Sequence, residues 1–287
     1  MVMSSTPTPG ARAVNQTGSV LTPGDPTSPV LLHVPHAGTE IPAWTRRHIV
    51  LDDAELAAEV AALTDHRTDE IAAAAADRAA IRPWMLVNRV SRFVVDPERF
   101  PDEREEMAAV GMAAVYTRGT RGQRLRAQGS PEAGAHRDAL LATYYVPWAA
   151  AVRAAVDDRL RATGRAVLID VHSYPSAPLP YELHADGPRP AVCLGADAAH
   201  TPSRLVDRAR ESFAPLGPVG TDSPFAGTYV PLAHHRIDLR VQSIMVEIRR
   251  DAYMAEPGGP LTAGATRMAE ALADLIDAVT SQHVAEP

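Results

Sequence analysis

Lysine is absent from this chain of 287 residues, whose 28 strongly basic side chains are all arginines. The absence excludes chemistry that depends on a lysine Schiff base or a lysine general base. Arginine instead offers a planar guanidinium that binds carboxylates through two parallel hydrogen bonds. The chain therefore carries groups suited to an anionic small molecule, although its own net charge is negative.

Cysteine is nearly absent as well. The single Cys193 excludes an internal disulfide and is consistent with a reducing compartment, and its apolar neighbours indicate a small buried side chain. The amino-terminal segment lacks a basic region followed by an apolar run, so no secretory signal is expected. No apolar run approaches the length of a membrane span. We therefore predict a cytoplasmic protein without a membrane partner.

Positive charge is in deficit, because 35 acidic residues outnumber the basic ones and give a net charge of −7. Nucleic-acid binding depends on a basic surface and is not expected. Residues 1–28 are rich in Ser, Thr, Pro and Gly and are predicted to form a disordered tail. Residues 29–283 are predicted to form a single domain, present as a monomer or small homo-oligomer.

After the tail, strand-like and helix-like runs alternate along the chain. Runs that predict strands lie at 30–34, 84–88, 92–95, 166–171, 191–195 and 243–248. Runs that predict helices lie at 53–78, 134–163, 201–213 and 262–280. This alternation is typical of an α/β fold in which helices cover both faces of a sheet.

His172 follows the most strand-like of these runs. The run 167–171 is apolar except for Asp170, which predicts a buried strand. His172 comes at its exit, where open α/β sheets bind their ligands. Asp170 lies two residues earlier on the same face, so it can hold the imidazole in one tautomer or support it as a metal ligand. A purely structural histidine at a strand end is the alternative.

Two other strand-like runs carry groups of the same kind. His36 follows the run 30–34, and Glu247 lies inside an apolar run late in the chain. Burial of an unpaired carboxylate is costly, so a metal, an arginine or a proton must lie close to Glu247. A structural ion pair with Arg249 or Arg250 is the alternative for this residue.

In these segments the chain resembles the N-formylglutamate amidohydrolase family of the zinc carboxypeptidase superfamily. The matching segments, in the family's order, are Pro35–Gly38, Thr64–Asp65, Ser91–Asp96, Asp170–Ser173, Pro224–Gly227 and Gln242–Tyr253. The resemblance implies a three-layer, zinc carboxypeptidase-like α/β fold with a mixed, mostly parallel sheet. It also implies hydrolysis of N-formyl-L-glutamate, or of a related N-acyl amino acid, to formate and the free amino acid, as in histidine degradation.

The chain departs from the family pattern at two places. The family's Asp-x-Asn-Arg appears as Asp96–Arg99, with Glu98 in the asparagine position, and a family Tyr-His pair appears as Pro147–Trp148. These departures bear on the substrate more than on the fold.

The resemblance implies a catalytic zinc or another divalent metal, with His36 and His172 as nitrogen ligands. Catalytic zinc takes three protein ligands and leaves one position for water. We choose Asp65 as the third ligand, because the family keeps an acidic residue there. Glu40 is the competing third ligand, and His33 competes if His36 is not a ligand.

The same resemblance gives Glu247 the role of general base and Arg92 a catalytic role. Zinc lowers the pKa of water toward neutrality, and Glu247 takes its proton and passes it to the departing amine. Zinc and an arginine stabilise the negative oxygen of the tetrahedral intermediate.

Further residues are expected to bind the anionic substrate. Arg99 lies in a family segment, whereas Arg118 and Arg121 lie in a glycine-rich basic loop, for which a solvated surface turn is the alternative. Gly227 and Tyr229 lie in a loop that we expect on the substrate side. The alternative functions are a metal-free binding protein and a zinc carboxypeptidase or deacylase acting on another N-acyl amino acid or peptide.

Overall fold

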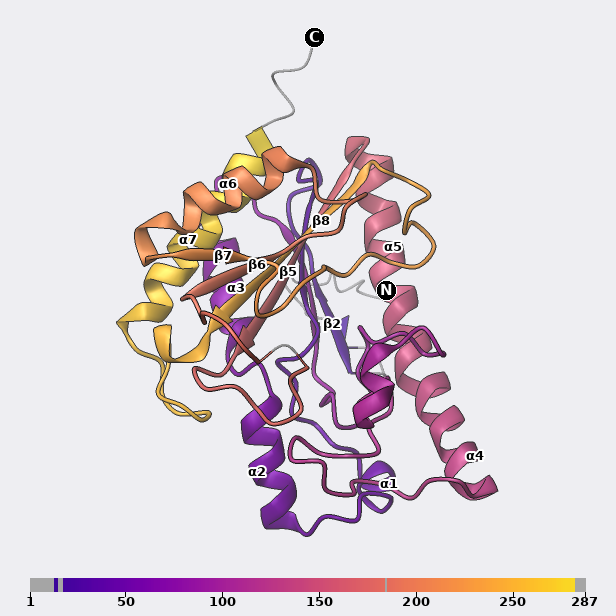
Figure 1. Ribbon diagram of the computed structural model, residues 1–287. Helices are drawn as coiled ribbons and strands as arrows, with labels where there is room; N and C mark the ends of the chain where they lie inside the picture. The colour runs from indigo at the N-terminus through magenta and orange to yellow at the C-terminus, as the bar shows by residue number, and fades with distance from the viewer. Residues whose placement is uncertain (1–12, 15–17, 184, 282–287) are drawn as a thin grey trace, which may run out of the picture.

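The computed structural model describes residues 13–14, 18–183 and 185–281, and these contain one eight-stranded sheet (Figure 1). The strand order is β1-β2-β4-β3-β5-β8-β6-β7. The central strands β4, β3, β5 and β8 run parallel, whereas β2 and β6 pair antiparallel with β4 and β8. The strands are β1 (Ala13–Val14), β2 (Ser19–Thr22), β3 (Val30–Val34), β4 (Trp84–Asn88), β5 (Ala166–Tyr174), β6 (Val192–Gly195), β7 (Val219–Thr221) and β8 (Val241–Arg249).

Helices cover both faces of this sheet, so the predicted three-layer α/β class with a mixed, mostly parallel sheet is confirmed (Figure 1). One face carries α3 (Thr68–Arg78), α6 (Ser203–Phe213) and α7 (Ala263–Thr280), and the other carries α5 (Val146–Thr163). Successive residues of β3 point to opposite faces, as expected for a strand. Leu32 packs into the core on the α3 and α7 side, and Leu31 packs with Trp148 and Val152 of α5.

The helix α5 continues α4 (Pro131–Leu140) through a π-helical turn at Leu141–Tyr145. With a mean hydropathy of 1.2 over one window, this 33-residue helix is long and apolar enough to cross a membrane, which corrects the expectation that no run has that length. The finding is weak evidence by itself, because core helices pass the same test. Here Trp148, Val152 and Val156 pack the helix against the sheet.

The predicted helix 53–78 is two helices in the structure, α2 (Asp53–Leu63) and α3, and the prediction of one continuous helix is wrong. Thr64 is extended, and Arg67 adopts a left-handed conformation with φ of 63°. The backbone N–H of Asp65 donates to the carbonyl of His36 at 3.1 Å instead of to a helical carbonyl. This tertiary bond overrides the helix propensity of the segment and turns Asp65 toward the end of β3.

Two further expectations about local structure are wrong. The segment 92–95 forms a turn closed by the Val94 N–H on the Ser91 carbonyl at 2.8 Å, rather than a strand. Part of the predicted tail is ordered, because Ser19–Thr22 pairs with β4 and buries Val20. The polar composition of that segment does not indicate that its backbone pairs with a strand of the sheet. Residues 1–12 and 15–17 of the tail, and 184 and 282–283 of the predicted domain, lie outside the described residues.

The remaining elements lie beyond the carboxyl ends of the parallel strands. They include α1 (Ala43–Arg46) and α2, near the bottom of Figure 1, and the 3-10 turn Glu106–Val110. Two more 3-10 turns lie at Ala214–Leu216 and Arg250–Ala252. A capping box between Asp52 and Glu55 fixes the start of α2.

Candidate active site

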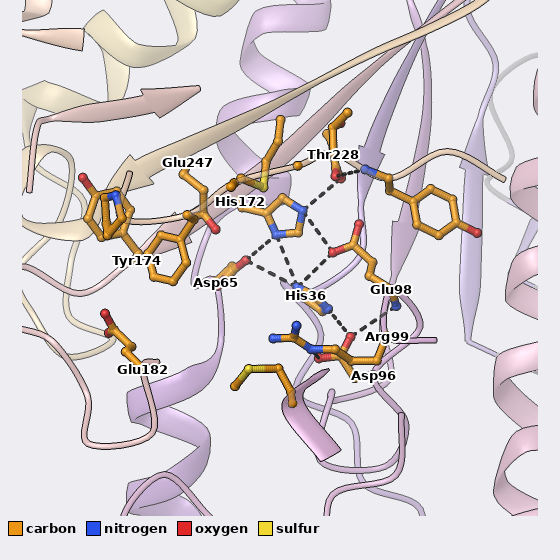
Figure 2. Close-up of a pocket in the computed structure, with 18 of the residues that line it drawn as sticks. His36, Asp65, Asp96, Glu98, Arg99, His172, Tyr174, Glu182, Thr228 and Glu247 are labelled. Carbon is orange, nitrogen blue, oxygen red and sulfur yellow. Dashed lines mark hydrogen bonds and ion pairs between the residues drawn. The ribbon is translucent and has the colours of Figure 1, made fainter. Parts of the chain in front are cut away.

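A cavity of about 630 Å³ lies at the carboxyl ends of β3, β5 and β8, where parallel sheets place their ligand sites (Figure 2). Most of the residues that the sequence nominated line it together. They are His36, Asp65, Arg92, Arg99, His172, Gly227, Tyr229 and Glu247. Segments that are far apart in the chain therefore meet in one pocket.

Three side chains, His36, His172 and Asp65, converge in the cavity (Figure 2). The Nδ1 atoms of His36 and His172 lie 3.3 Å apart. Oδ2 of Asp65 lies 3.1 Å from Nδ1 of His172 and 3.8 Å from Nδ1 of His36. All three side chains are buried. Two ligands at ~2 Å from a tetrahedral zinc stand roughly 3.3 Å apart, so this donor set fits such an ion.

Each of the two imidazoles has a carboxylate close to its Nε2 atom. Nε2 of His36 lies 2.9 Å from Oδ1 of Asp96, and Nε2 of His172 lies 2.9 Å from Oδ1 of Asp170. Asp170 therefore shares a face with His172, as the alternation along the strand predicted. Such carboxylates fix the ring orientation and raise the basicity of metal-binding histidines. Arg250 approaches Asp65, with Nη2 at 3.4 Å from Oδ1.

The electrostatics of this cluster favour charged carboxylates. Burial raises the pKa of Asp96, but the nearby Arg92 and His36 outweigh burial and hold that pKa well below its usual range. Burial likewise raises the pKa of Asp170, and His172 and His33 hold it well below its usual range. Burial lowers the pKa of His172, but Asp170 and Glu98 outweigh it and hold the pKa well above its usual range. A metal ion would have to displace the proton of this imidazole.

Glu247 is opposite His172 on the neighbouring strand β8. Figure 2 shows its carboxylate beside His172 and Asp65. The residue is 8% exposed, and within the described part of the chain its Oε2 has no hydrogen-bond partner. Burial raises its pKa to about 8, despite the opposing effect of His172. A carboxylate with a pKa near neutrality can accept and return a proton.

The two predicted arginines of the cavity differ in their contacts. Nη2 of Arg92 lies 2.7 Å from Oδ2 of Asp96, and its Nε donates to the Tyr116 hydroxyl at 3.0 Å. Arg99 has looser ion pairs, at 3.7 Å to Asp96 and 3.6 Å to Glu105. The side chain of Arg99 is 27% exposed, so its guanidinium is the more accessible of the two.

Comparison with known proteins agrees with this geometry. A family described as N-formylglutamate amidohydrolase matches residues 28–254, which is most of the chain. The chain belongs to the N-formylglutamate amidohydrolase family. It is accordingly an amidohydrolase, with the cavity at the carboxyl ends of the strands as its candidate active site. A search of curated proteins finds no match.

Solved structures share the fold of this N-formylglutamate amidohydrolase family member. An N-formylglutamate amidohydrolase from Ralstonia eutropha JMP134 has a TM-score of 0.75 and 21% identity, covering 93% of this chain and 98% of that one. A gene product from Agrobacterium tumefaciens has a TM-score of 0.67 and 19% identity, covering 94% and 97%.

Several nominated residues of this amidohydrolase lie away from the cavity. Arg118 and Arg121 are exposed and are not among the residues that line it, so the structure does not bring them together with the other predicted site residues. Their loop instead folds onto α2, where Glu59 receives hydrogen bonds from the Thr120 N–H at 2.7 Å and the Gln123 Nε2 at 2.6 Å. The surface-turn alternative therefore fits this loop.

The alternatives for the metal ligand and for the ion pair of Glu247 have different surroundings. His33 forms a second potential metal-binding group with Glu98 and Asp170, and Glu98 also groups with His36 and His172. Glu40 is exposed and lies 3.8 Å from Arg89. His33 is fully buried, with Nδ1 at 2.8 Å from Asp170 and its ring stacked on Tyr229. Arg249 pairs with Asp251, and Arg250 with Asp65, so among the described residues neither forms a salt bridge with Glu247.

The sequence assigned no catalytic or binding role to four residues at or beside the amidohydrolase site: Asp96, Glu98, Tyr116 and Arg250. The first two lie in the family-like segment that departs at Glu98, and that departure was the available signal. Arg250 was considered only as a partner for Glu247. Tyr116, whose hydroxyl donates to Asp96 in a short contact, follows an unremarkable apolar segment and gave no signal.

Proposed function

We propose that this protein is a metal-dependent amidohydrolase that cleaves the amide of N-formyl-L-glutamate or of a related N-acyl amino acid. The observation that carries the proposal is the convergence of two imidazole Nδ1 atoms and the Asp65 carboxylate beside Glu247. Membership of the N-formylglutamate amidohydrolase family supports the same reaction class.

His36, His172 and Asp65 would hold the metal, which we propose to be zinc. When bound, such an ion lowers the pKa of a water molecule and polarises the carbonyl of the amide. Glu247 takes a proton from the attacking water and delivers it to the nitrogen that leaves. Its lack of a hydrogen-bond partner at Oε2 within the described chain leaves that oxygen available for this transfer.

Arg92 and Arg99 have different proposed roles in binding and catalysis. Arg92 is held in place by Asp96 and Tyr116 and supplies positive charge at the carbonyl oxygen. Arg99 lines the cavity with an accessible guanidinium and receives a substrate carboxylate. Gly227 and Tyr229 form part of the cavity wall and face the substrate. We also propose a cytoplasmic location and a monomer or small homo-oligomer.

The decisive experiment measures formate release from a series of N-formyl amino acids, with and without a chelator. Release should depend on the metal, and elemental analysis should find about one divalent ion per chain. His36→Ala and His172→Ala should each lose most of this ion. Release that survives complete removal of metal, or normal metal content in both variants, would contradict the proposal.

A further inference from the structure

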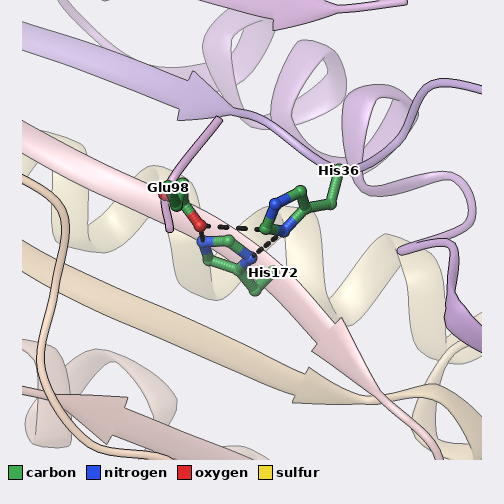
Figure 3. A group of neighbouring side chains, drawn as sticks. All are labelled: His36, Glu98 and His172. Carbon is green, nitrogen blue, oxygen red and sulfur yellow. Dashed lines mark hydrogen bonds and ion pairs between the residues drawn. The ribbon is translucent and has the colours of Figure 1, made fainter. Parts of the chain in front are cut away.

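Glu98 lies among three histidines, and Figure 3 shows it beside two of them, His36 and His172. Its Oε2 is 3.2 Å from Nε2 of His172 and 3.6 Å from Nδ1 of His36, and its Oε1 is 3.4 Å from Nδ1 of His33. Oε1 has no hydrogen-bond partner within the described part of the chain. The side chain is 15% exposed and lines the cavity, so a bound molecule can approach it.

Carboxylates outnumber guanidiniums around the metal-ligand cluster, which disfavours a substrate with two carboxylates. Five carboxylates and three guanidiniums line this part of the cavity. The carboxylates are Asp65, Asp96, Glu98, Asp170 and Glu247, and the guanidiniums are Arg92, Arg99 and Arg250. Glu98 therefore adds a carboxylate at a place where a second substrate carboxylate would need a positive partner.

The hydrogen bonds of the three arginines show which guanidinium is accessible to a ligand. Arg92 donates to Asp96 and Tyr116, and Arg250 donates to Ser173 and the Ala62 carbonyl. Arg99 has only the two loose ion pairs already described, and no hydrogen bond to any residue in the described ranges. One guanidinium is thus accessible, which suffices for one carboxylate of a ligand.

We propose that Glu98 selects substrates with a single carboxylate, in which the amino-acid side chain is a neutral amide or a cation rather than an acid. This proposal rests on the proposed function and narrows its substrate class. A carboxylate on Glu98 repels a nearby substrate carboxylate strongly enough to change reactivity by about tenfold or more. The same carboxylate accepts hydrogen bonds from an amide N–H or a guanidinium.

The test compares kcat/KM of the zinc-loaded protein for N-formyl-L-glutamate, N-formyl-L-glutamine and N-formyl-L-arginine. Glutamate and glutamine have nearly the same shape, so their ratio measures the charge effect. The wild type should favour glutamine over glutamate by about tenfold or more. Glu98→Gln should shift this ratio toward glutamate by a similar factor, because it removes the charge and keeps the shape.

Glu106→Gln is the matched control, because Glu106 lines the same cavity but is exposed. It removes the same charge where solvent screens it, so the ratio should change by less than about twofold. Zinc content should be unchanged in both variants. A wild-type preference for glutamate, an unchanged ratio in Glu98→Gln, or loss of zinc from that variant alone would each overturn the proposal for Glu98.

Calorimetric binding of the same three compounds gives a readout that does not depend on turnover. If none of them is hydrolysed by the zinc-loaded protein, the proposed function fails, and binding decides the role of Glu98. Tighter binding of the glutamine than of the glutamate derivative, lost in Glu98→Gln, supports the selection. Equal binding, tighter binding of the glutamate derivative, or no binding overturns it.

Discussion

Glu247 has a raised pKa because the effect of burial outweighs the opposing effects of His172, Arg250 and Arg92. Its neighbours across the strands are apolar or carry their own partners, and neither following arginine forms a salt bridge with it in the described chain. Burial of the charged carboxylate costs free energy, and protonation removes that charge, so the pKa rises. A buried carboxylate with a raised pKa is better suited to proton transfer than to stabilising the folded protein.

Replacement of Glu247 by glutamine separates a base from a metal ligand and from a structural group. Glu247→Gln keeps the shape and removes the proton acceptor, so kcat should fall by roughly 10²–10⁴. Metal content and melting temperature should stay close to those of the wild type. Loss of metal with activity would identify a ligand, and full turnover in a folded, metal-loaded variant would contradict the role of base.

At the scale of elements, the break between α2 and α3 places Leu63 and Asp65 in the wall of the site, and the loop after Tyr116 packs on α2 away from the cavity. The break places Asp65 against His36. The loop is tied to α2 by Glu59, whose carboxylate receives the N–H and hydroxyl of Thr120 and the amide of Gln123. Thr120 and Glu59 are both buried, so these bonds have no water to replace them.

Truncation of Glu59 should therefore destabilise the protein. Glu59→Ala leaves at least two buried donors without acceptors, which should lower the free energy of unfolding by about 2–4 kcal/mol. Glu70→Ala is the control, because Glu70 forms an exposed ion pair with Arg67 and should cost less than about 1 kcal/mol. Urea unfolding of the two variants gives the comparison. Equal losses would show that the bonds to the loop contribute little.

At the scale of the whole molecule, metal binding and folding are coupled through protons. The folded apoprotein holds a proton on His172 more tightly than the unfolded chain does, since its pKa is raised. That group therefore stabilises the apoprotein below the ordinary imidazole pKa of about 6.5, and its contribution disappears as the pH rises through the raised value. Metal binding needs the imidazole without this proton.

The increase in melting temperature that zinc causes should therefore be larger at pH 8 than at pH 6. At pH 6 the metal must displace the proton of His172, whereas at pH 8 a smaller fraction of the protein carries that proton. The metal-free protein is also less stable at pH 8, so binding of zinc raises its melting temperature further. Thermal unfolding with zinc and with chelator at both pH values measures the two increments. His172→Ala should remove the difference, and equal increments in the wild type would argue against His172 as a ligand.

The sequence alone determined the alternating fold class and the placement of His36, His172 and Glu247 at or near strand ends. These features follow from apolar runs and from the alternation along a strand, which are local properties of the chain. Resemblance to a family added Asp65 and Arg92. Residue patterns therefore sufficed for most of the side chains that meet in the cavity.

Only the tertiary structure decided which loops reach that cavity. The basic loop at Arg118 and Arg121 looked suited to an anion, yet it folds onto Glu59, whereas Arg99 and Glu98 line the site. The helix break at Asp65 depends on a bond to His36, a residue 29 positions earlier. Such choices arise from packing and hydrogen bonds between distant segments, which outweigh the local preferences that a sequence pattern expresses.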